Sequence, residues 1–324
     1  MSAKTIGKLL ILLLFFLNGQ IGLSQLSKEE QIVQLIKTES NSKKKFNRIM
    51  ALGEFYKINN IEKADSIKEV IVRKSRVFDD TTRFNALFYK AEIANLTGNQ
   101  ELYFKTILEC QPFLNRLNTD DIRFKLFRHL GYYHSRMLEH ETAQFYFRNC
   151  IKTAKRNHNN QRLAESYSFL SLDFMASNSK DSAMLYVEKS IKTARRTKNK
   201  TELAKAFNTQ ARIYDFFGQI ELSVAKNLIS LQLVEETHNI YLLSQYSRET
   251  GKAQEIILNL NDAELYFKQS LNYAQQINDQ RQTALALISL ASIQLKRKNY
   301  KEATSNALKS INYLTDLNDF NGLG

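Results

Sequence analysis

The feature that most constrains this chain is an internal repeat of 40 residues. A small residue followed by an aliphatic one recurs at this interval through the second half of the chain. Similar segments surround these positions, as in the pairs Ala183 and Val187 or Ala263 and Phe267. Self-similarity at a fixed period of this length is typical of stacked repeat proteins. The positions are Cys110-Gln111, Cys150-Ile151, Ser190-Ile191, Ser230-Leu231, Ser270-Leu271 and Ser310-Ile311, and only the first departs from the small–aliphatic pattern.

Composition indicates that the repeated unit is helical. Hydrophobic residues make up 43% of the 324 residues, with 20 Phe and 15 Tyr, which is enough material for a continuous core. Ten Gly and one Pro are few for a fold rich in tight turns, and alternating Val/Ile/Thr runs are missing. We therefore expect an all-α chain.

The period divides the chain into about seven helix–turn–helix repeats, which begin near residues 45, 84, 124, 164, 204, 244 and 284. We expect residues 25–44 to form a lead-in helix and linker, 45–319 the repeat domain, and 320–324 a tail. Pro112 falls near the end of the second helix of the second repeat. A proline removes a backbone donor there and crowds the preceding turn, so this helix should kink or stop early.

Columns of small residues indicate where the two helices of a repeat approach closely. Phe147, Leu170 and Phe267 are large and are expected to fill the space that small residues leave. A bulky residue at a small site should cost about 1–3 kcal/mol through overpacking. The small positions are Gly131, Ser171, Ala211, Gly251 and Ala291 on the first helices, and Ala143, Ala183, Ala263 and Ala303 on the second helices.

These columns resemble the tetratricopeptide repeat (TPR) family, whose pattern matches Leu130-Gly131 with Ala143 and Phe147, and Leu290-Ala291 with Ala303. The resemblance covers roughly residues 45–319. It implies an all-α, right-handed superhelical solenoid whose first helices line the concave face. It also resembles long-helix variants in exported regions of bacterial sensor and regulator proteins.

The chain departs from the family pattern in three ways. The early aromatic residue is Phe127, Tyr167 and Phe207 in three repeats but Ser247 and Leu287 in later ones. The proline between repeats is absent. The period is 40 residues and not about 34, and about six extra residues lengthen the helices of each repeat by about 9 Å.

The first 24 residues have the features of a secretory signal peptide. Lys4 and Lys8 precede the apolar run Leu9–Leu17, and Gly22-Leu23-Ser24 offers small residues for cleavage before Gln25. A spanning helix needs roughly 20 apolar residues, so a retained anchor is the less favoured alternative. No later stretch is apolar enough to cross a membrane. We expect an exported chain, periplasmic or secreted.

The two cysteines, Cys110 and Cys150, occupy equivalent sites of adjacent repeats. Equivalent points on stacked helices lie roughly 8–10 Å apart, whereas a disulfide needs Cα atoms within about 7 Å. We therefore expect two free thiols in the core.

The formal net charge is +13, and removal of the leader with its two lysines leaves +11. Such a surface attracts anionic partners, although it also serves simply to keep a protein solvated. One basic group follows the second helices, where it either complements the helix dipole or binds an anionic membrane surface. It comprises Lys152, Lys155, Arg156, Arg162, Lys192, Arg195, Arg196, Lys198 and Lys200.

The sequence carries no motif for catalysis, so we expect no enzyme, no cofactor and no metal. No Gly-rich phosphate loop and no Gly-x-Ser-x-Gly nucleophile elbow is present. No pair of histidines has the i,i+4 spacing that suits a metal on a helix. The histidines are His129, His134, His140, His158 and His238.

A set of polar residues on the first helices forms the candidate binding groove. By the TPR resemblance they point into the concave face of repeats three to six, with seven basic residues against the acidic Glu165, Asp215 and Glu255. Arginine forks suit carboxylates, so a groove for an acidic peptide or a C-terminal carboxylate is the functional hypothesis, and a solvated charged face is the alternative. The candidates are Lys125, Arg128, Tyr132, Arg136, Lys205, Asn208, Arg212, Arg248 and Lys252.

These observations favour a non-enzymatic exported scaffold that binds a peptide or protein segment in its concave groove. The alternative is the ligand-sensing region of a signal-transduction protein, of the histidine kinase or helix-turn-helix regulator type, whose output domain is missing or separately encoded. No capping helix is visible after Asp319, so we also expect self-association or partner docking through the last repeat. A nucleic-acid partner is not expected for an exported protein.

Overall fold

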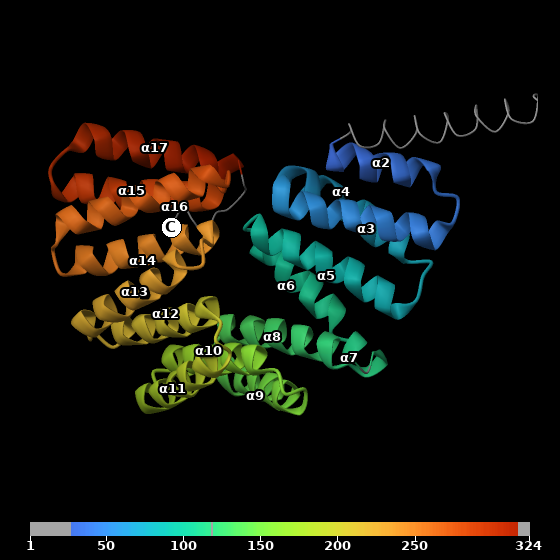
Figure 1. Cartoon of the computed structure of the whole chain (residues 1–324), viewed down its shortest axis with the longest axis horizontal. Coiled ribbons are helices and arrows are strands. Elements are labelled where there is room, and N and C mark those ends of the chain that lie inside the picture. The colour runs from blue at the N-terminus through green and yellow to red at the C-terminus, as the bar shows by residue number, and fades with distance from the viewer. Residues whose placement is uncertain (1–26, 118, 317–324) are drawn as a thin grey trace, which may run out of the picture. The chain divides into compact units, whose positions relative to one another are not determined.

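The computed structural model describes residues 27–117 and 119–316, apart from the side chains of residues 58 and 59. These residues form helices joined by short turns, and no strand occurs among them (Figure 1). The predicted all-α fold is therefore confirmed. The proposed leader and the tail lie outside the described residues. The chain divides into two compact units, residues 1–96 and 97–324, and each is described by itself.

Unit 1 contains the helices α2 (Lys28–Thr38), α3 (Ser42–Asn59), α4 (Ile61–Ser75) and α5 (Asp80–Leu96). Helix α2 begins at a capping box, in which Ser27 and Glu30 each bond the other's backbone N–H. The core of the unit includes Ile71 and Tyr89. The Tyr89 hydroxyl donates to the carbonyl of Gly53 at 3.1 Å, so α5 is tied to α3.

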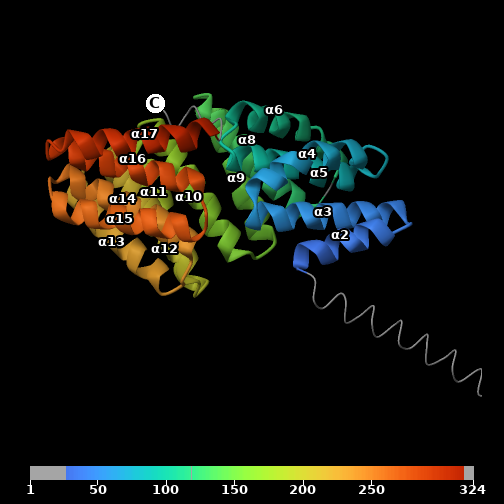
Figure 2. The same ribbon diagram turned by 90° about the horizontal axis from the view of Figure 1, so that it is seen from above.

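Unit 2 consists of consecutive helix pairs in which each second helix also packs against the first helix of the next pair. Figures 1 and 2 both show α14 to α17 lying side by side in chain order. This is the predicted solenoid of TPR-like pairs. The helices are α6 (Gln100–Cys110), α7 (Phe113–Arg116), α8 (Asp120–Arg136), α9 (His140–Arg156), α10 (Asn160–Ala176), α11 (Lys180–Arg196), α12 (Lys200–Phe216), α13 (Ile220–Glu235), α14 (Ile240–Ile256), α15 (Leu260–Gln276), α16 (Gln280–Lys296) and α17 (Tyr300–Asp316).

The turns of unit 2 follow a 20-residue half-period that the sequence does not announce. Each regular helix ends in a residue with positive φ, and the next N–H bonds back across the helix end, as from Glu139 to the carbonyl of His134 at 2.9 Å. Asn side chains then cap several following helices, as Asn159 does for α10. The positive-φ residues are Leu138, His158, Asn178, Lys198, Gly218, His238, Leu258, Asn278 and Lys298.

The small columns lie where the helices of a pair meet, as predicted. A Cβ added to Gly131 would lie 2.5 Å from Cε1 of Phe147, and one added to Gly251 would lie 2.5 Å from Cε1 of Phe267. Glycine is thus required at these two positions because a phenylalanine ring of the second helix rests against the backbone of the first.

The conserved spacing of the serine and cysteine positions has a second cause beyond size. Ser190 and Ser230 donate their hydroxyls to backbone carbonyls 26 residues earlier, on the first helix of the same pair, at 2.8 and 3.0 Å. Cys150 makes the equivalent contact through Sγ at 3.7 Å. Cys110 and Cys150 are both buried and not joined in a disulfide, as expected.

Pro112 ends a helix early, as expected. Helix α6 stops at Cys110 after 11 residues, whereas the regular second helix α9 runs for 17. Pro112 then occupies the N-cap position of the four-residue helix α7. The second helix of this repeat is therefore broken in two, and α6 and α7 each touch α8 through few residues.

Candidate functional site

The predicted groove residues lie on the first helices of unit 2 in two separate groups. One group belongs to α8 and the other to α12 and α14, whereas α10 between them contributes only the acidic Glu165. The α8 group is Lys125, Arg128, Tyr132 and Arg136, and the second group is Lys205, Asn208, Arg212, Arg248 and Lys252.

Arg128 is part of a buried chain of hydrogen bonds that joins three helices. Its Nη1 lies 3.0 Å from Oε1 of Glu165 on α10, and its Nη2 donates to Nε2 of His129 at 2.8 Å. Because Nε2 accepts, Nδ1 of His129 carries the ring proton and donates to the hydroxyl of Tyr103 on α6 at 2.6 Å. Burial holds the pKa of His129 well below its usual value, so the ring is neutral.

The other α8 candidates differ in how open they are. Lys125 pairs with Asp121 one turn earlier on the same helix at 2.9 Å. Tyr132 is 42% exposed and its ring lies 6.0 Å from that of Phe104. Arg136 is exposed. A surface pair such as Lys125–Asp121 is worth about 0–1 kcal/mol and is easily exchanged for another partner.

Two cations of the second group are also held by carboxylates of their own helices. Lys205 lies 2.9 Å from Oε1 of Glu202, and Arg248 lies 2.9 Å from Oε1 of Glu249. The Arg248 side chain is only 13% exposed. Its role in the structure is therefore to hold Glu249 in place.

Arg212 and Lys252 open onto a hollow of about 260 Å³ between α12, α13 and α14. Asn208 reaches the same place indirectly, because its Nδ2 donates to Oδ1 of Asn227 at 3.3 Å. We call this the α12–α14 hollow. Its lining is Arg212, Asp215, Ser223, Asn227, Glu249, Lys252, Ala253, Glu255 and Ile256.

Burial disfavours both signs of charge in the α12–α14 hollow. It raises the pKa of Asp215, and the neighbouring Glu249 adds to this effect. It lowers the pKa of Lys252, with Arg248 acting in the same direction. Both groups would gain from a ligand that brings the opposite charge, because their charged forms are poorly solvated here.

The charge balance of the hollow differs from the seven-to-three basic excess counted along the face. Two cations, Arg212 and Lys252, face the three carboxylates Asp215, Glu249 and Glu255. Glu255 is further engaged by Lys296 of α16 at 2.8 Å. The lining is therefore mixed in sign and nearly balanced.

Sequence reasoning missed Glu249, Ser223 and Asn227. Glu249 could have been noticed from its place beside Arg248 and three residues before Lys252. Ser223 and Asn227 sit on a second helix, four residues apart, and are buried where other repeats place apolar or small residues. A buried Asn at the position of Phe147 and Phe267 is the signal that comparison of repeats could have used.

The described residues contain no group of three or more His, Cys, Asp or Glu side chains arranged to hold a metal. His140 Nδ1 instead lies 3.0 Å from Oδ1 of Asp173 on the neighbouring pair.

Much of the basic group at the repeat junctions is also paired. Arg156 contacts Asp120, Arg162 contacts Asp121, and Lys200 contacts Glu236. These contacts connect neighbouring helix pairs, so part of this charge serves to join repeats.

Within the described ranges, each helix is too short or too polar to span a bilayer.

Comparison with known proteins identifies the fold. No family model matches the chain, and no curated protein matches its sequence. Among solved structures, a Rap protein complexed with competence and sporulation factor is similar over 88% of this chain and 85% of its own, with a TM-score of 0.58 and 15% identity. Aspartyl phosphate phosphatase F from Bacillus subtilis is similar over 91% of this chain and 89% of its own, with a TM-score of 0.54 and 13% identity.

A third similar structure has a TPR region in its description. It is a signal transduction ATPase with numerous domains that has a tetratricopeptide repeat sensor, from Pyrococcus horikoshii, at a TM-score of 0.50 and 13% identity. The similarity covers 88% of this chain and 42% of that protein. At these identities the comparisons establish the fold alone: the chain is a TPR-like helical repeat solenoid.

Proposed function

We propose that this chain is a non-enzymatic scaffold that holds a peptide or protein segment against the α12–α14 hollow. The observation that carries the proposal is the pair of poorly solvated charges in that hollow, Asp215 and Lys252. Their pKa shifts, one raised and one lowered by burial, mean that each has an unmet need for an opposite charge. A hollow of this kind recognises a polar segment better than an apolar one.

The mixed lining narrows the sequence hypothesis of an acidic ligand. A segment that places a carboxylate beside Arg212 and Lys252, and a donor beside Asp215, satisfies both signs of charge. A purely acidic segment would instead meet repulsion from Glu249 and Glu255. The preferred ligand therefore carries one carboxylate and one basic or amide group a few residues apart.

Neighbouring structures support a binding role and a sensing role. One similar structure is a Rap protein complexed with competence and sporulation factor, and another has a tetratricopeptide repeat sensor. The second candidate function is accordingly the ligand-sensing region of a signalling protein. In both roles the residues around the α12–α14 hollow make the contact.

We also propose that the protein works outside the cytoplasm, on the basis of the leader pattern in residues 1–24. N-terminal sequencing of the protein from its native host tests this directly. A mature chain that begins near Gln25 agrees with export and cleavage, and an intact Met1 in a cytoplasmic fraction contradicts it.

A displayed library of random-sequence heptapeptides, selected on the immobilised protein, provides the probe for the α12–α14 hollow. Binding of an enriched peptide, measured by isothermal titration calorimetry, should fall at least tenfold in the Arg212→Ser, Lys252→Ser double variant. Arg128→Ser, which lies in the other group, should change it little.

The matched control carries the same charge change away from the hollow, at two exposed lysines of α17: Lys301→Ser with Lys309→Ser. Peptides that bind the hollow variant and the wild type equally, or that lose affinity equally in the α17 control, would refute the assignment. Circular dichroism of each variant shows whether the helices are intact.

A further inference from the structure

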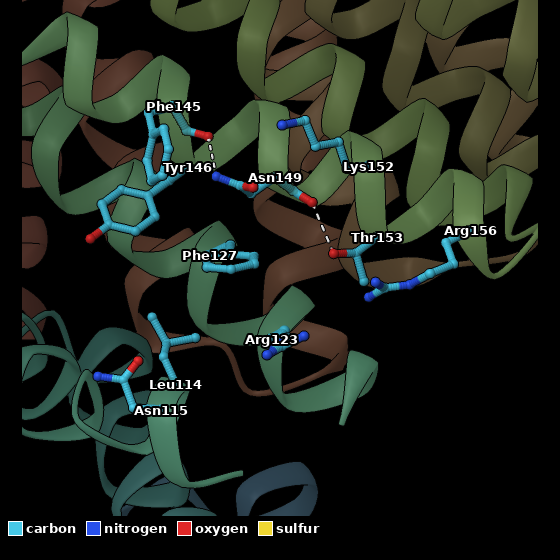
Figure 3. Close-up of a pocket in the computed structure, with 10 residues that line it drawn as sticks. All are labelled: Leu114, Asn115, Arg123, Phe127, Phe145, Tyr146, Asn149, Lys152, Thr153 and Arg156. Carbon is cyan, nitrogen blue, oxygen red and sulfur yellow. Dashed lines mark hydrogen bonds between the residues drawn. The ribbon is translucent and has the colours of Figure 1, made fainter. Parts of the chain in front are cut away.

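A second hollow, of about 390 Å³, lies beside α7 between the side chains of α8 and α9, apart from the α12–α14 hollow (Figure 3). Its size is within the range of sites for small ligands, roughly 300–1,000 Å³. We call it the α7–α9 hollow. Its lining includes Leu114, Arg123, Phe127, Tyr146, Lys152 and Arg156.

The proline break explains why this hollow exists here. In the regular pairs a 17-residue second helix covers the next first helix, but α6 ends after 11 residues and the chain turns at Pro112. Leu114 of α7 then forms one wall of the hollow. The space that a continuous second helix would fill next to α8 and α9 is thus left partly open.

Arg123 interrupts a column of leucines. The residues 40, 80 and 120 positions later are Leu163, Leu203 and Leu243, which pack at the contacts between helix pairs. Arg123 is only partly exposed and faces the hollow, beside Phe127 one turn along α8. A partly buried cation at a site that elsewhere holds leucine lowers stability unless an anion offsets its charge.

The cations around the α7–α9 hollow are not balanced by the protein. Arg156 is held by Asp120, with Nε 3.1 Å from Oδ2 and a second contact from Nη2 to Oδ1. Among the described residues, Arg123 and Lys152 have no carboxylate partner, and no carboxylate lines the hollow. Two positive charges remain for a ligand.

Neutral polar groups of the wall are already committed as donors. Asn149 Nδ2 donates to the carbonyl of Phe145 at 2.9 Å, and the Thr153 hydroxyl donates to the carbonyl of Asn149 at 2.9 Å (Figure 3). An anion bound here would therefore take its hydrogen bonds chiefly from Arg123 and Lys152. An arginine fork matches the two oxygens of a carboxylate.

An apolar surface continues from the cationic side of the hollow. Phe127 lies between Tyr146 and Arg123 in Figure 3, and the rings of Phe127 and Tyr146 are 6.0 Å apart. Phe145 beside them is 60% exposed, and Leu114 closes the far side. Free inorganic anions have no group that would bury this surface, so the ligand must carry an apolar part.

We propose that the α7–α9 hollow binds a carboxylate attached to a bulky apolar group, with the carboxylate on Arg123 and Lys152 and the apolar group against Phe127, Tyr146 and Leu114. Two sources supply this chemistry: a free aryl or alkyl acid, and the C-terminal residue of a polypeptide chain. The site shares no residue with the α12–α14 hollow, so the two assignments succeed or fail separately.

Isothermal titration calorimetry of the full chain tests the proposal with four probes: N-acetylphenylalanine, its C-terminal amide, phenylacetate and inorganic phosphate. We expect saturable binding of at least one of the two carboxylates, and binding at least tenfold weaker for the amide and for phosphate. Tighter binding of N-acetylphenylalanine identifies a chain end as the natural source, and tighter binding of phenylacetate identifies a free acid.

Arg123→Leu restores the residue found in the next three repeats, so the variant should fold and keep its helicity while losing at least tenfold in affinity. Lys152→Ala should weaken binding several-fold. Lys192→Ala, the equivalent position on α11, is the matched control and should have no effect. The proposal is overturned if neither carboxylate saturates, if the amide binds as tightly as the acid, or if Arg123→Leu binds as well as the wild type.

Discussion

The contact between Gly131 and Phe147 allows the packing of a helix pair to be tested quantitatively. In Gly131→Ala the new Cβ would lie 2.5 Å from Cε1, 2.7 Å from Cδ1 and 2.9 Å from Cζ of the ring. Overpacking of this kind costs about 1–3 kcal/mol. The better helix propensity of alanine returns about 1 kcal/mol. We expect a net loss of about 1–2 kcal/mol in the free energy of unfolding from these two effects.

A double-mutant cycle isolates the clash from other effects. The next repeat pairs Ser171 with Val187 at the two equivalent positions, which suggests Phe147→Val as the partner change. This substitution leaves a cavity and is destabilising by itself, but it removes the ring that Gly131→Ala would meet. In that background the alanine should be neutral or stabilising, so the interaction energy should be about 1–2 kcal/mol in favour of the pair.

Urea unfolding of the four chains, followed by circular dichroism at 222 nm, measures this interaction energy. The equivalent cycle at Gly251 and Phe267 should give the same sign, because the Cβ there would also lie 2.5 Å from the ring. Additive losses within about 0.5 kcal/mol would show that the ring yields easily, and would refute the close approach as the reason for glycine in this column.

Three further predictions concern single sites. Burial holds the pKa of His129 well below 6.5, so the unfolded chain binds this proton first and stability falls as the pH is lowered through about 6.5; thermal melts from pH 7.5 to 5 should show this, with a flatter profile in His129→Gln and an unchanged one in the exposed His238→Asn. Leu258 has φ 63° and is 74% exposed, so Leu258→Gly should raise the free energy of unfolding by up to about 1 kcal/mol, and a lower melting temperature would contradict this. Burial raises the pKa of Cys110 to about 12 and also raises that of Cys150, so a thiol reagent at pH 8 should label neither in the native protein and both in denaturant, and rapid labelling of the native chain would show that the thiols are not buried.

The helix pairs and their close contacts could be predicted from the sequence because their signal is local and repeated. Glycine at 131 and 251 and phenylalanine 16 residues later recur at fixed spacing, and a pattern seen twice has a common geometric cause. The stop at Pro112 was predictable for a similar reason, because a missing backbone donor acts on its own helix regardless of the tertiary fold.

The charged face was harder to interpret because the fate of a charge depends on side chains of other helices. Arg128 seemed available for a ligand, yet Glu165 on the next first helix and His129 beside it occupy its guanidinium. Spacing places residues on a face but does not reveal which rotamers meet across two helices. The α12–α14 hollow likewise depends on Asn227, which no charge count includes.

The α7–α9 hollow illustrates a signal that was present but requires the repeats to be aligned. Arg123 differs from the leucines at the same position of later repeats, and Pro112 breaks the helix next to it. The turns illustrate the opposite case. Leu138 and Leu258 adopt positive φ although leucine disfavours it, so only the packing of 17-residue helices on both sides determines the conformation of these turns.

Hydrogen exchange measured by mass spectrometry, with and without a heptapeptide selected on the protein, tests the central claim that this solenoid binds a polar segment at the α12–α14 hollow. The account predicts slower exchange on peptide addition in the C-terminal halves of α12 and α14 and the first half of α13, and no such change in the Arg212→Ser, Lys252→Ser variant. Protection confined to other helices, or equal protection in the variant, would contradict it.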